Sequence, residues 1–371
     1  MSNDLLWGGG EGLAQMLALL GVKPKWLSNG KVRSFEIVPL EQLGRPRIDV
    51  TVKLSGILRD NFRDRMEFLD RAIYAVAALE EPEEMNYVRK HTLAAMESGL
   101  PFEDAAARLF GAKPGTYLTG ITLQIYSSAW QEHSDMTDVF THFNGYCYSG
   151  GRYGTEAFGS LARTLKTVDI TYNKVMNDEH DLLGCSCYYG AQGGMTAAAR
   201  ELSGRDVKAY YGDTREAGDI KVRAMSEELS RVVRSRLLNP KWIEGQKQHG
   251  YKGATDISKR IGRIYGWEAT TGDIGDWVFD GITRTYIENE ENRRFMEENN
   301  PWAMEEIVRR LIEAQRRGLW KPADGLEELL EDAYLDIEGI LEENVGDGSE
   351  TFQGGAIEIS GIPVFGGEDD V

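Results

Sequence analysis

Residues 178–195, which read DEHDLLGCSCYYGAQGGM, gather more side chains suited to polar chemistry than any other stretch of this 371-residue chain. Glu179, His180 and Asp181 are adjacent proton acceptors, and Cys185 and Cys187 follow them as soft sulfur donors. Carboxylate, imidazole and thiolate groups can accept a proton from a substrate or hold a divalent metal ion. The stretch therefore predicts a site for metal chemistry or proton transfer.

The second half of the stretch has residues that could shape a binding surface. Tyr188 and Tyr189 offer aromatic faces, Gln192 offers an amide, and Gly193 with Gly194 permits close approach of the backbone. A purely structural interpretation explains the same stretch. The histidine could cap a turn, the cysteines could be small buried hydrophobes, and the glycines could begin the Ala-rich helix that follows. Because His-x4-Cys-x-Cys is not a common structural zinc spacing, the spacing alone leaves both interpretations open.

The elements around this stretch indicate a strand-helix series. Residues 168–172 (VDITY) and 207–212 (VKAYYG) are predicted strands, and a helix is predicted from Met195 between them. Ligands in open α/β sheets bind outside the carboxyl ends of the strands. Asp213 and Thr214, directly after the second strand, are therefore expected near the loop that carries the candidate site.

The first part of the chain repeats this alternation of strands and helices. The apolar stripe of Leu69, Ile73 and Val76 is typical of a helix face packed in a core. Helices are predicted over residues 9–20, 64–79 and 83–97, and strands over residues 34–38 and 48–54. The predicted fold class is α/β, with open, mostly parallel sheets, flanking helices and a helix-rich C-terminal part.

Three further segments carry polar residues. A helix predicted over residues 220–238 contains Arg231 and Arg234, whose guanidinium groups could form solvated salt bridges or bind carboxylates. Residues 239–253 and 266–280 are predicted loops, and the first contains His249, a second acid-base candidate beside Glu244. The glycine-rich residues 111–120 are predicted to form a plain turn or an anion-binding loop, and no GxxxxGK[ST] motif occurs in the chain.

The net charge of −18 is concentrated near the C-terminus, because 15 acidic residues and no Lys or Arg follow Lys321. The rest of the chain is close to neutral, which excludes the basic surface that nucleic-acid binding requires. No apolar run is long enough to span a bilayer, and a cytoplasmic protein is expected. Three cysteines in a chain of this length predict reduced thiols.

Three parts are predicted from these patterns. Residues 1–115 are expected to form an α/β domain that is incomplete at its N-terminus. Residues 116–320 are expected to form an α/β to helical domain that carries the candidate site, and residues 321–371 an acidic helix and a flexible tail.

Several strings, in order between Gly10 and Trp320, resemble the C-terminal third of the cobaltochelatase large subunit, whose close relative is the large subunit of magnesium chelatase. They are LALLGVKP, VPLEQLGRPRIDV, SGILRDNF, EEMNYVRKH, LLNPKWIEGQKQHGYKG, GWEATTG and ENNPWAMEEI. The segment NDEHDLLG at residues 177–184 resembles the cobalt branch more than the magnesium branch.

The resemblance implies a chelatase that inserts cobalt(II) into a tetrapyrrole of the hydrogenobyrinic acid a,c-diamide class. ATP would be hydrolysed on separate ATPase subunits, and a further chain could supply the N-terminal part of the large subunit. The alternatives are a magnesium chelatase that acts on protoporphyrin and a non-catalytic tetrapyrrole- or metal-binding protein.

The chemistry of such an enzyme needs a base, a metal ligand, apolar walls and cations for the carboxylates of the ring. The resemblance thus assigns Glu179, His180 and Asp181 to proton transfer, and His180, Cys185 and Cys187 to the metal. The expected tetrapyrrole-binding residues are Tyr188, Tyr189, Gln192, Arg231, Arg234 and His249. Where the family usually has acidic residues and a histidine in this loop, this chain has Ser186, Cys187 and Gln192.

Overall fold

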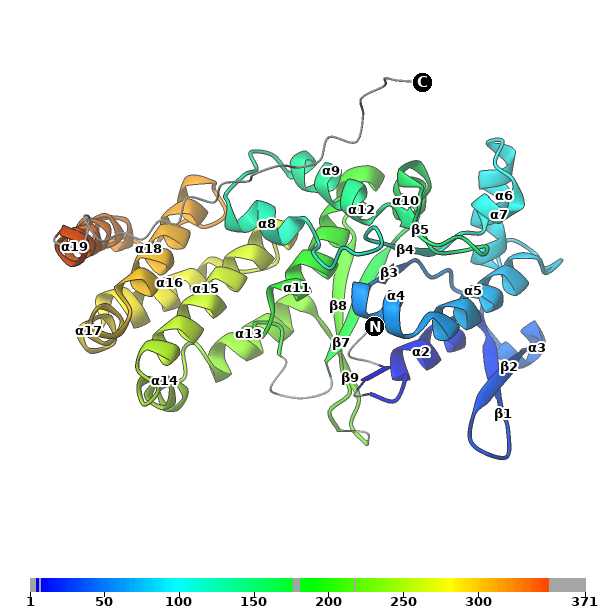
Figure 1. Ribbon diagram of the computed structural model, residues 1–371, viewed down its shortest axis with the longest axis horizontal. Helices are drawn as coiled ribbons and strands as arrows, with labels where there is room; N and C mark the ends of the chain where they lie inside the picture. Colours follow the sequence, from blue (N-terminus) through cyan, green and yellow to red (C-terminus); the bar gives the residue numbers. More distant parts are fainter. Residues whose placement is uncertain (1–4, 7, 176–180, 217, 347–371) are drawn as a thin grey trace, which may run out of the picture.

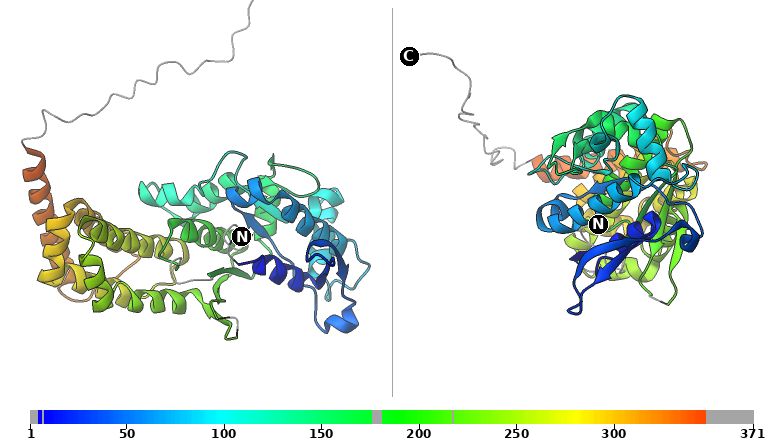
Figure 2. Two further views of the ribbon diagram at one scale, coloured as in Figure 1. Left: turned by 60° about the horizontal axis from the view of Figure 1, so that its bottom comes forward. Right: turned by 90° about the vertical axis from the view of Figure 1, so that its right-hand side faces the viewer.

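Two hydrophobic cores form the interior of the protein, one built mainly from residues 13–109 and the other from residues 107–337. The computed structural model describes residues 5–6, 8–175, 181–216 and 218–346, and these form an elongated structure with a purely helical end (Figures 1 and 2). The predicted α/β class and the helix-rich C-terminal part are confirmed.

The first core packs helices α2 and α5 against short strands. Leu69, Ile73 and Val76 are buried along α5, which confirms the predicted apolar stripe. Gly21 ends α2 because its left-handed backbone, with φ of 72°, cannot continue the helix. The elements of this part are α2 (Glu11–Leu20), β1 (Val22–Trp26), β2 (Val32–Ile37), α3 (Leu40–Leu43), β3 (Val52–Leu54), α4 (Gly56–Asn61), α5 (Arg63–Ala77), α6 (Tyr87–Glu97), α7 (Phe102–Ala105) and β4 (Leu109–Gly111).

The central part of the chain carries two strand groups with helices between them. Its elements are α8 (Ile121–Tyr126), α9 (His133–Asn144), β5 (Tyr146–Cys147), β6 (Thr155–Glu156), α10 (Phe158–Leu165), β7 (Ile170–Val175), α11 (Ser186–Tyr188), the π-helix η1 (Tyr189–Gly193), α12 (Gly194–Ser203), β8 (Lys208–Asp213) and β9 (Lys221–Ala224). The strand order is β3-β4-β5-β6 in one sheet and β7-β8-β9 in another. Strands β1 and β2 form a separate hairpin.

The sheets are mixed, which corrects the expectation of mostly parallel sheets. Among the described strands, β3–β4 and β7–β8 are parallel and the other pairs are antiparallel. The reason lies in the connections. Short loops join β5 to β6 and β8 to β9, and a short connection can join only antiparallel neighbours.

The C-terminal part is a stack of helices centred on α15. Helix α15 packs against α18, and α18 packs against the acidic helix α19, whose apolar residues Leu330, Ala333 and Ile337 join the second core. The elements are α13 (Met225–Ser235), α14 (Pro240–Lys247), α15 (Tyr251–Thr271), α16 (Asp276–Thr283), the π-helix η2 (Arg284–Glu288), α17 (Glu290–Asn299), α18 (Pro301–Arg316) and α19 (Leu326–Gly346). Within the described residues, no helix is long and apolar enough to cross a membrane.

Two local predictions were wrong. The helix predicted over residues 220–238 begins only at Met225, because residues 221–224 pair with β8 as strand β9. The loops predicted over residues 239–253 and 266–280 are largely helical. Their glycines serve helix packing: a Cβ on Gly253 would lie 1.9 Å from the carbonyl oxygen of Gln246, and one on Gly266 would lie 2.7 Å from the ring of Tyr189.

This close packing predicts opposite effects for two alanine substitutions in α15. Gly266→Ala should lower the free energy of unfolding by about 1–3 kcal/mol, because the buried ring of Tyr189 cannot move away from the new methyl group. Gly262→Ala, one turn earlier, meets nothing within 4 Å and should raise the free energy of unfolding by up to about 1 kcal/mol. Urea unfolding followed by circular dichroism measures both. Equal effects of the two variants would contradict the assigned contact.

Candidate functional site

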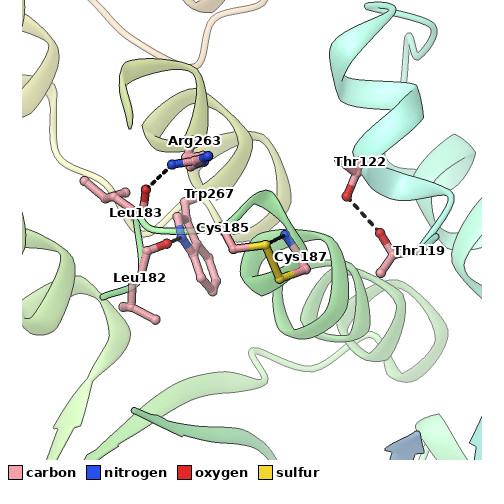
Figure 3. Close-up of a disulfide and its surroundings, with 8 residues drawn as sticks. All are labelled: Thr119, Thr122, Leu182, Leu183, Cys185, Cys187, Arg263 and Trp267. Atoms are coloured by element: carbon pink, nitrogen blue, oxygen red, sulfur yellow. Dashed lines mark hydrogen bonds between the residues drawn. A yellow bond between two sulfur atoms is a disulfide. The ribbon is translucent and has the colours of Figure 1, made fainter. Parts of the chain in front are cut away.

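The start of the candidate site is held against one face of helix α15. The carboxylate of Asp181 accepts hydrogen bonds of 2.9 Å from Arg260 Nη1 and lies 3.6 Å from Arg236 Nε. The next two carbonyl oxygens accept from the same helix: Arg263 Nη1 donates to Leu183 and Trp267 Nε1 donates to Leu182 (Figure 3). Asp181 is therefore a buried ion-pair partner that anchors the loop.

The structure joins Cys185 and Cys187 in a disulfide across a single intervening residue (Figure 3). The expectation of reduced thiols is therefore wrong for this pair in the structure, because the fold brings the two sulfur atoms together at the start of a helix. Cys185 precedes α11, and its Sγ accepts a hydrogen bond of 3.3 Å from the Cys187 amide. Cys187 is exposed, so reductants and oxidants can reach the pair.

Residues 186–203 form one continuous run of helix in which a π-turn replaces the predicted irregular loop. The ring of Tyr189 is buried against Gly266, and Tyr188 is also part of the second core. The predicted close approach at the two glycines is present. A Cβ on Gly193 would lie 2.3 Å from Thr270 Oγ1, and one on Gly194 would lie 2.8 Å from Ile121.

Gln192 lies within the π-turn and faces strand β8. Its Nε2 donates a 3.0 Å hydrogen bond to the carbonyl oxygen of Tyr210. Its Oε1 is buried and has no hydrogen-bond partner among the described residues. The amide is thus a polar group with one open acceptor beside the middle of strand β8. π-turns often occur at functional sites.

A second network of charges lies where strand β8 ends. Asp213 accepts from Arg215 at 2.7 Å and from Arg223 at 2.8 Å, and the bond from Arg215 holds the pKa of Asp213 well below its usual range. Arg223 Nη1 also lies 3.3 Å from the buried carboxylate of Glu228, which accepts from Arg231 at 2.6 Å. Guanidinium groups and carboxylates thus alternate in one chain of ion pairs beside the site.

The other predicted residues are scattered. Arg231 pairs with Glu228, and Arg234 lies over the ring of Trp277 at 4.6 Å from its centroid. His249 is exposed in the turn between α14 and α15, while Glu244 pairs with Lys247 instead. The structure therefore brings Asp181, the cysteines, both tyrosines and Gln192 together along one segment and leaves Arg234 and His249 elsewhere.

The metal site remains a prediction. Glu179 and His180 lie outside the described residues, so the structure does not place them. Within the part that is described, no group of three or more His, Cys, Asp or Glu side chains is arranged to hold a metal ion.

Sequence reasoning missed the residues that position the site. Arg260, Arg263 and Trp267 are three and four residues apart, a spacing that places them on one helix face. The spacing does not stand out in the sequence, because Trp267 belongs to residues 266–280, which are predicted to form a loop. Once α15 is recognised as a helix, the spacing identifies the three residues as a common surface.

Comparison with known proteins identifies the family of the chain. A family model described as CobN/Magnesium Chelatase matches residues 1–326, which is most of the chain. The chain belongs to this family. An uncharacterized protein of Methanocaldococcus jannaschii is 52% identical over 98% of this chain, and the match covers 30% of that protein.

Named members of the family resemble the chain over nearly the same region. The aerobic cobaltochelatase subunit CobN of Pseudomonas aeruginosa is 39% identical over 90% of this chain and 28% of its own length. A magnesium-chelatase subunit of Chlorobaculum parvum is 36% identical over 91% of this chain and 27% of its own length. The chain thus spans about three tenths of the length of the curated relatives it matches.

The fold is also shared with a solved structure of the family. The catalytic subunit of cobaltochelatase from Mycobacterium tuberculosis superposes with a TM-score of 0.86 at 38% identity, over 88% of this chain and 28% of that one. The resemblance inferred from sequence strings is confirmed at the level of the family. Relatives of both the cobalt and the magnesium type are present.

Helix α15 also carries a buried acid that predicts a pH-dependent stability. Burial raises the pKa of Glu268 from 4.5 to about 7, although its carboxylate accepts a hydrogen bond from the Ile274 amide. An acid whose pKa is raised by folding stabilises the protein below its unfolded pKa, and this contribution is lost as the pH rises to the folded value. The loss falls between pH 4.5 and about pH 7, and reaches about 3 kcal/mol.

Glu268→Gln keeps the acceptor for the Ile274 amide but carries no charge, so it should be more stable than the wild type at pH 8 by up to about 3 kcal/mol. The gain should vanish near pH 4.5. Chemical unfolding at a series of pH values measures the difference, with the exposed Glu227→Gln as the matched control. A gain that does not change with pH would contradict the assignment.

Proposed function

We propose that this chain forms part of the large subunit of an ATP-dependent chelatase that inserts cobalt(II) into a tetrapyrrole of the hydrogenobyrinic acid a,c-diamide class. The observation that carries the proposal is the match to CobN/Magnesium Chelatase over residues 1–326, which includes the candidate site. The Pseudomonas aeruginosa relative named as a cobaltochelatase subunit supports it over nine tenths of the chain.

The charge network at the end of β8 suits the substrate. Arg215, Arg223 and Arg231 gather there, so a ring with several carboxylate groups would find guanidinium donors close together. Tyr188 and Tyr189 are packed in the core, and they would support the site from beneath instead of stacking on the ring. The open acceptor of Gln192 would orient a donor group of the substrate.

Proton removal from the ring nitrogens needs a base that is not already engaged. Asp181 is held by Arg260 and lies near Arg236, so this role falls to His180 or Glu179 in the proposal. The imidazole is the stronger candidate, because its ordinary pKa lies near neutral pH.

Sulfur ligands distinguish the cobalt and magnesium alternatives. Thiolate and imidazole favour cobalt(II) over magnesium, which prefers oxygen ligands. The disulfide must first be reduced, because only a thiolate binds the metal. Insertion of magnesium into protoporphyrin remains the second candidate, and the Chlorobaculum parvum relative named as a magnesium-chelatase subunit favours it. A non-catalytic tetrapyrrole- or metal-binding protein is the third.

ATP hydrolysis is assigned to partner subunits in this proposal. The chain contains no GxxxxGK[ST] motif to cradle phosphates, so Mg-ATP would bind only on the ATPase subunits of the complex.

Tetrapyrrole binding tests the proposed function. Absorbance titration with hydrogenobyrinic acid a,c-diamide should give saturable binding that is tighter than binding of protoporphyrin. Arg231→Gln should weaken it about tenfold, because a charge-assisted contact to a carboxylate is lost. Arg294→Gln, an exposed arginine on α17, should have no effect. No spectral change with either ring at high micromolar concentration would refute the proposal, and tighter binding of protoporphyrin would favour the magnesium alternative.

Cobalt(II) titration tests the predicted metal ligands. Reduced protein should develop a sulfur-to-cobalt charge-transfer band, whereas the oxidised protein and a Cys185→Ser, Cys187→Ser double variant should not. Affinity should fall as the pH drops through the imidazole range, because His180 must be neutral to coordinate. His180→Ala should cost more affinity than His133→Ala, which serves as its control. Identical spectra for the reduced protein and the double variant would show that the cysteines only pack.

A further inference from the structure

The disulfide between Cys185 and Cys187 contributes little to holding its segment in place. The bridge spans one intervening residue (Figure 3), and the stabilisation that a cross-link gives through chain entropy grows with the length of the loop that it closes. The residues before the bridge are already fixed by Arg260, Arg263 and Trp267 of α15, through hydrogen bonds that involve no sulfur. The fold therefore does not need the bridge to position this part of the chain.

The two sulfur atoms of the bridge belong to residues that differ in their access to solvent. Cys187 is exposed, whereas Cys185 is half-buried and packs against the second core. The Sγ atom of Cys185 also accepts a 3.3 Å hydrogen bond from the Cys187 amide. An external thiolate can therefore approach Cys187, and the sulfur that leaves, that of Cys185, already has a hydrogen-bond donor beside it.

The third cysteine, Cys147, has the opposite character. Its side chain is fully buried in the second core, and burial raises the pKa of its thiol. The Ser149 amide donates a hydrogen bond of 3.4 Å to its Sγ atom. Because the thiolate is the reactive form of a cysteine, Cys147 should be inert while the protein is folded.

We propose that Cys185 and Cys187 form a reactive site for thiol–disulfide exchange with soluble low-molecular-weight thiols. Exposed disulfides are the ones that exchange readily, in contrast to buried structural bridges. This bridge has an exposed member, and the segment that carries it is anchored without it. The proposal concerns sulfur chemistry alone and depends on neither the metal nor the ring of the proposed function.

The exchange proceeds in two balanced steps. A first thiolate attacks Cys187 Sγ and forms a mixed disulfide, while the bond to Cys185 breaks and Cys185 leaves as a thiolate that takes up a proton. A second thiolate then attacks the external sulfur of the mixed disulfide and releases Cys187, which is also protonated. The pair gains two electrons and two protons, and the two external thiols lose them and become one disulfide.

The exchange would decide whether thiols are present at the predicted metal ligands Cys185 and Cys187. Only the reduced pair could bind cobalt(II) through sulfur, because a disulfide offers no thiolate. This consequence rests on the proposed function, whereas the exchange itself does not.

The test equilibrates the full 371-residue chain in glutathione buffers that range from oxidised to reduced, and then alkylates the free thiols with iodoacetamide. Mass spectrometry of the digested protein gives the labelled fraction at each cysteine. Cys185 and Cys187 should pass together from unlabelled to labelled without denaturant, whereas Cys147 should stay unlabelled until the protein unfolds. A pair that resists reduced glutathione in the folded protein, or a pair that is labelled in every buffer, would overturn the proposal.

Single variants test which sulfur is attacked. Oxidised glutathione should form a mixed disulfide with Cys187 in the Cys185→Ser variant at least about tenfold faster than with Cys185 in the Cys187→Ser variant, because Cys187 is the exposed member of the pair. Thermal unfolding checks that both variants fold. Equal rates would overturn the assignment of Cys187 as the attacked sulfur.

Urea unfolding of the wild type in oxidised and in reduced glutathione tests whether the bridge is structural. The two midpoints should be nearly the same, because the bridge closes a very short loop. A marked fall of the midpoint on reduction would show that the bridge holds the fold and would overturn the proposal. None of these measurements involves a tetrapyrrole or a metal, so failure here is distinguishable from failure of the proposed function.

Discussion

The close packing of helix α15 against residues 181–193 is the contact on which the candidate site depends. Arg260, Arg263 and Trp267 bind the backbone and the acid that open the segment, and Gly266 admits the ring of Tyr189. The contact is both polar and apolar. The buried carbonyl oxygens of Leu182 and Leu183 accept hydrogen bonds from α15. Gly266 has no side chain, so the two helices can lie close together. Loss of either component would release the cysteine-bearing turn from its support.

The state of the cysteine pair links the fold to its chemistry. A disulfide between Cys185 and Cys187 leaves no thiolate at the start of α11, while reduction would give two thiols at the same place. The neighbouring charges are arranged differently. Asp181 and Asp213 are engaged by arginines, so these carboxylates stabilise the architecture and hold guanidinium groups in place beside the site.

The sheet β7-β8-β9 has one face buried in the second core and one face that is partly exposed. It supports the candidate segment on the buried face, and Ile170, Tyr172 and Val222 are exposed on the other face. This division follows from the alternation of side chains along each strand.

The sequence alone determined the family, the α/β class, the three longest helices of the first part and the segment that carries the candidate site. These predictions rest on local patterns such as the stripe of Leu69, Ile73 and Val76, or on strings of identical residues, and such patterns are readable without a fold. Tertiary structure alone decided which residues support the site. In the sequence Gly266 favours a loop, yet it lies inside a 21-residue helix, where Tyr189 occupies the space that a side chain would need.

The cysteine pair and the aromatic pair illustrate the same limit. Spacing left open whether the thiols bind a metal or pack, and the turn before α11 joins them in a disulfide. Tyr188 and Tyr189 were expected to face a ligand, but the helix run directs both rings into the core. Residue type and spacing predict what a side chain is able to do. Its direction and partners depend on contacts between segments far apart in the chain, such as Asp181 with Arg260, which only the folded structure brings together.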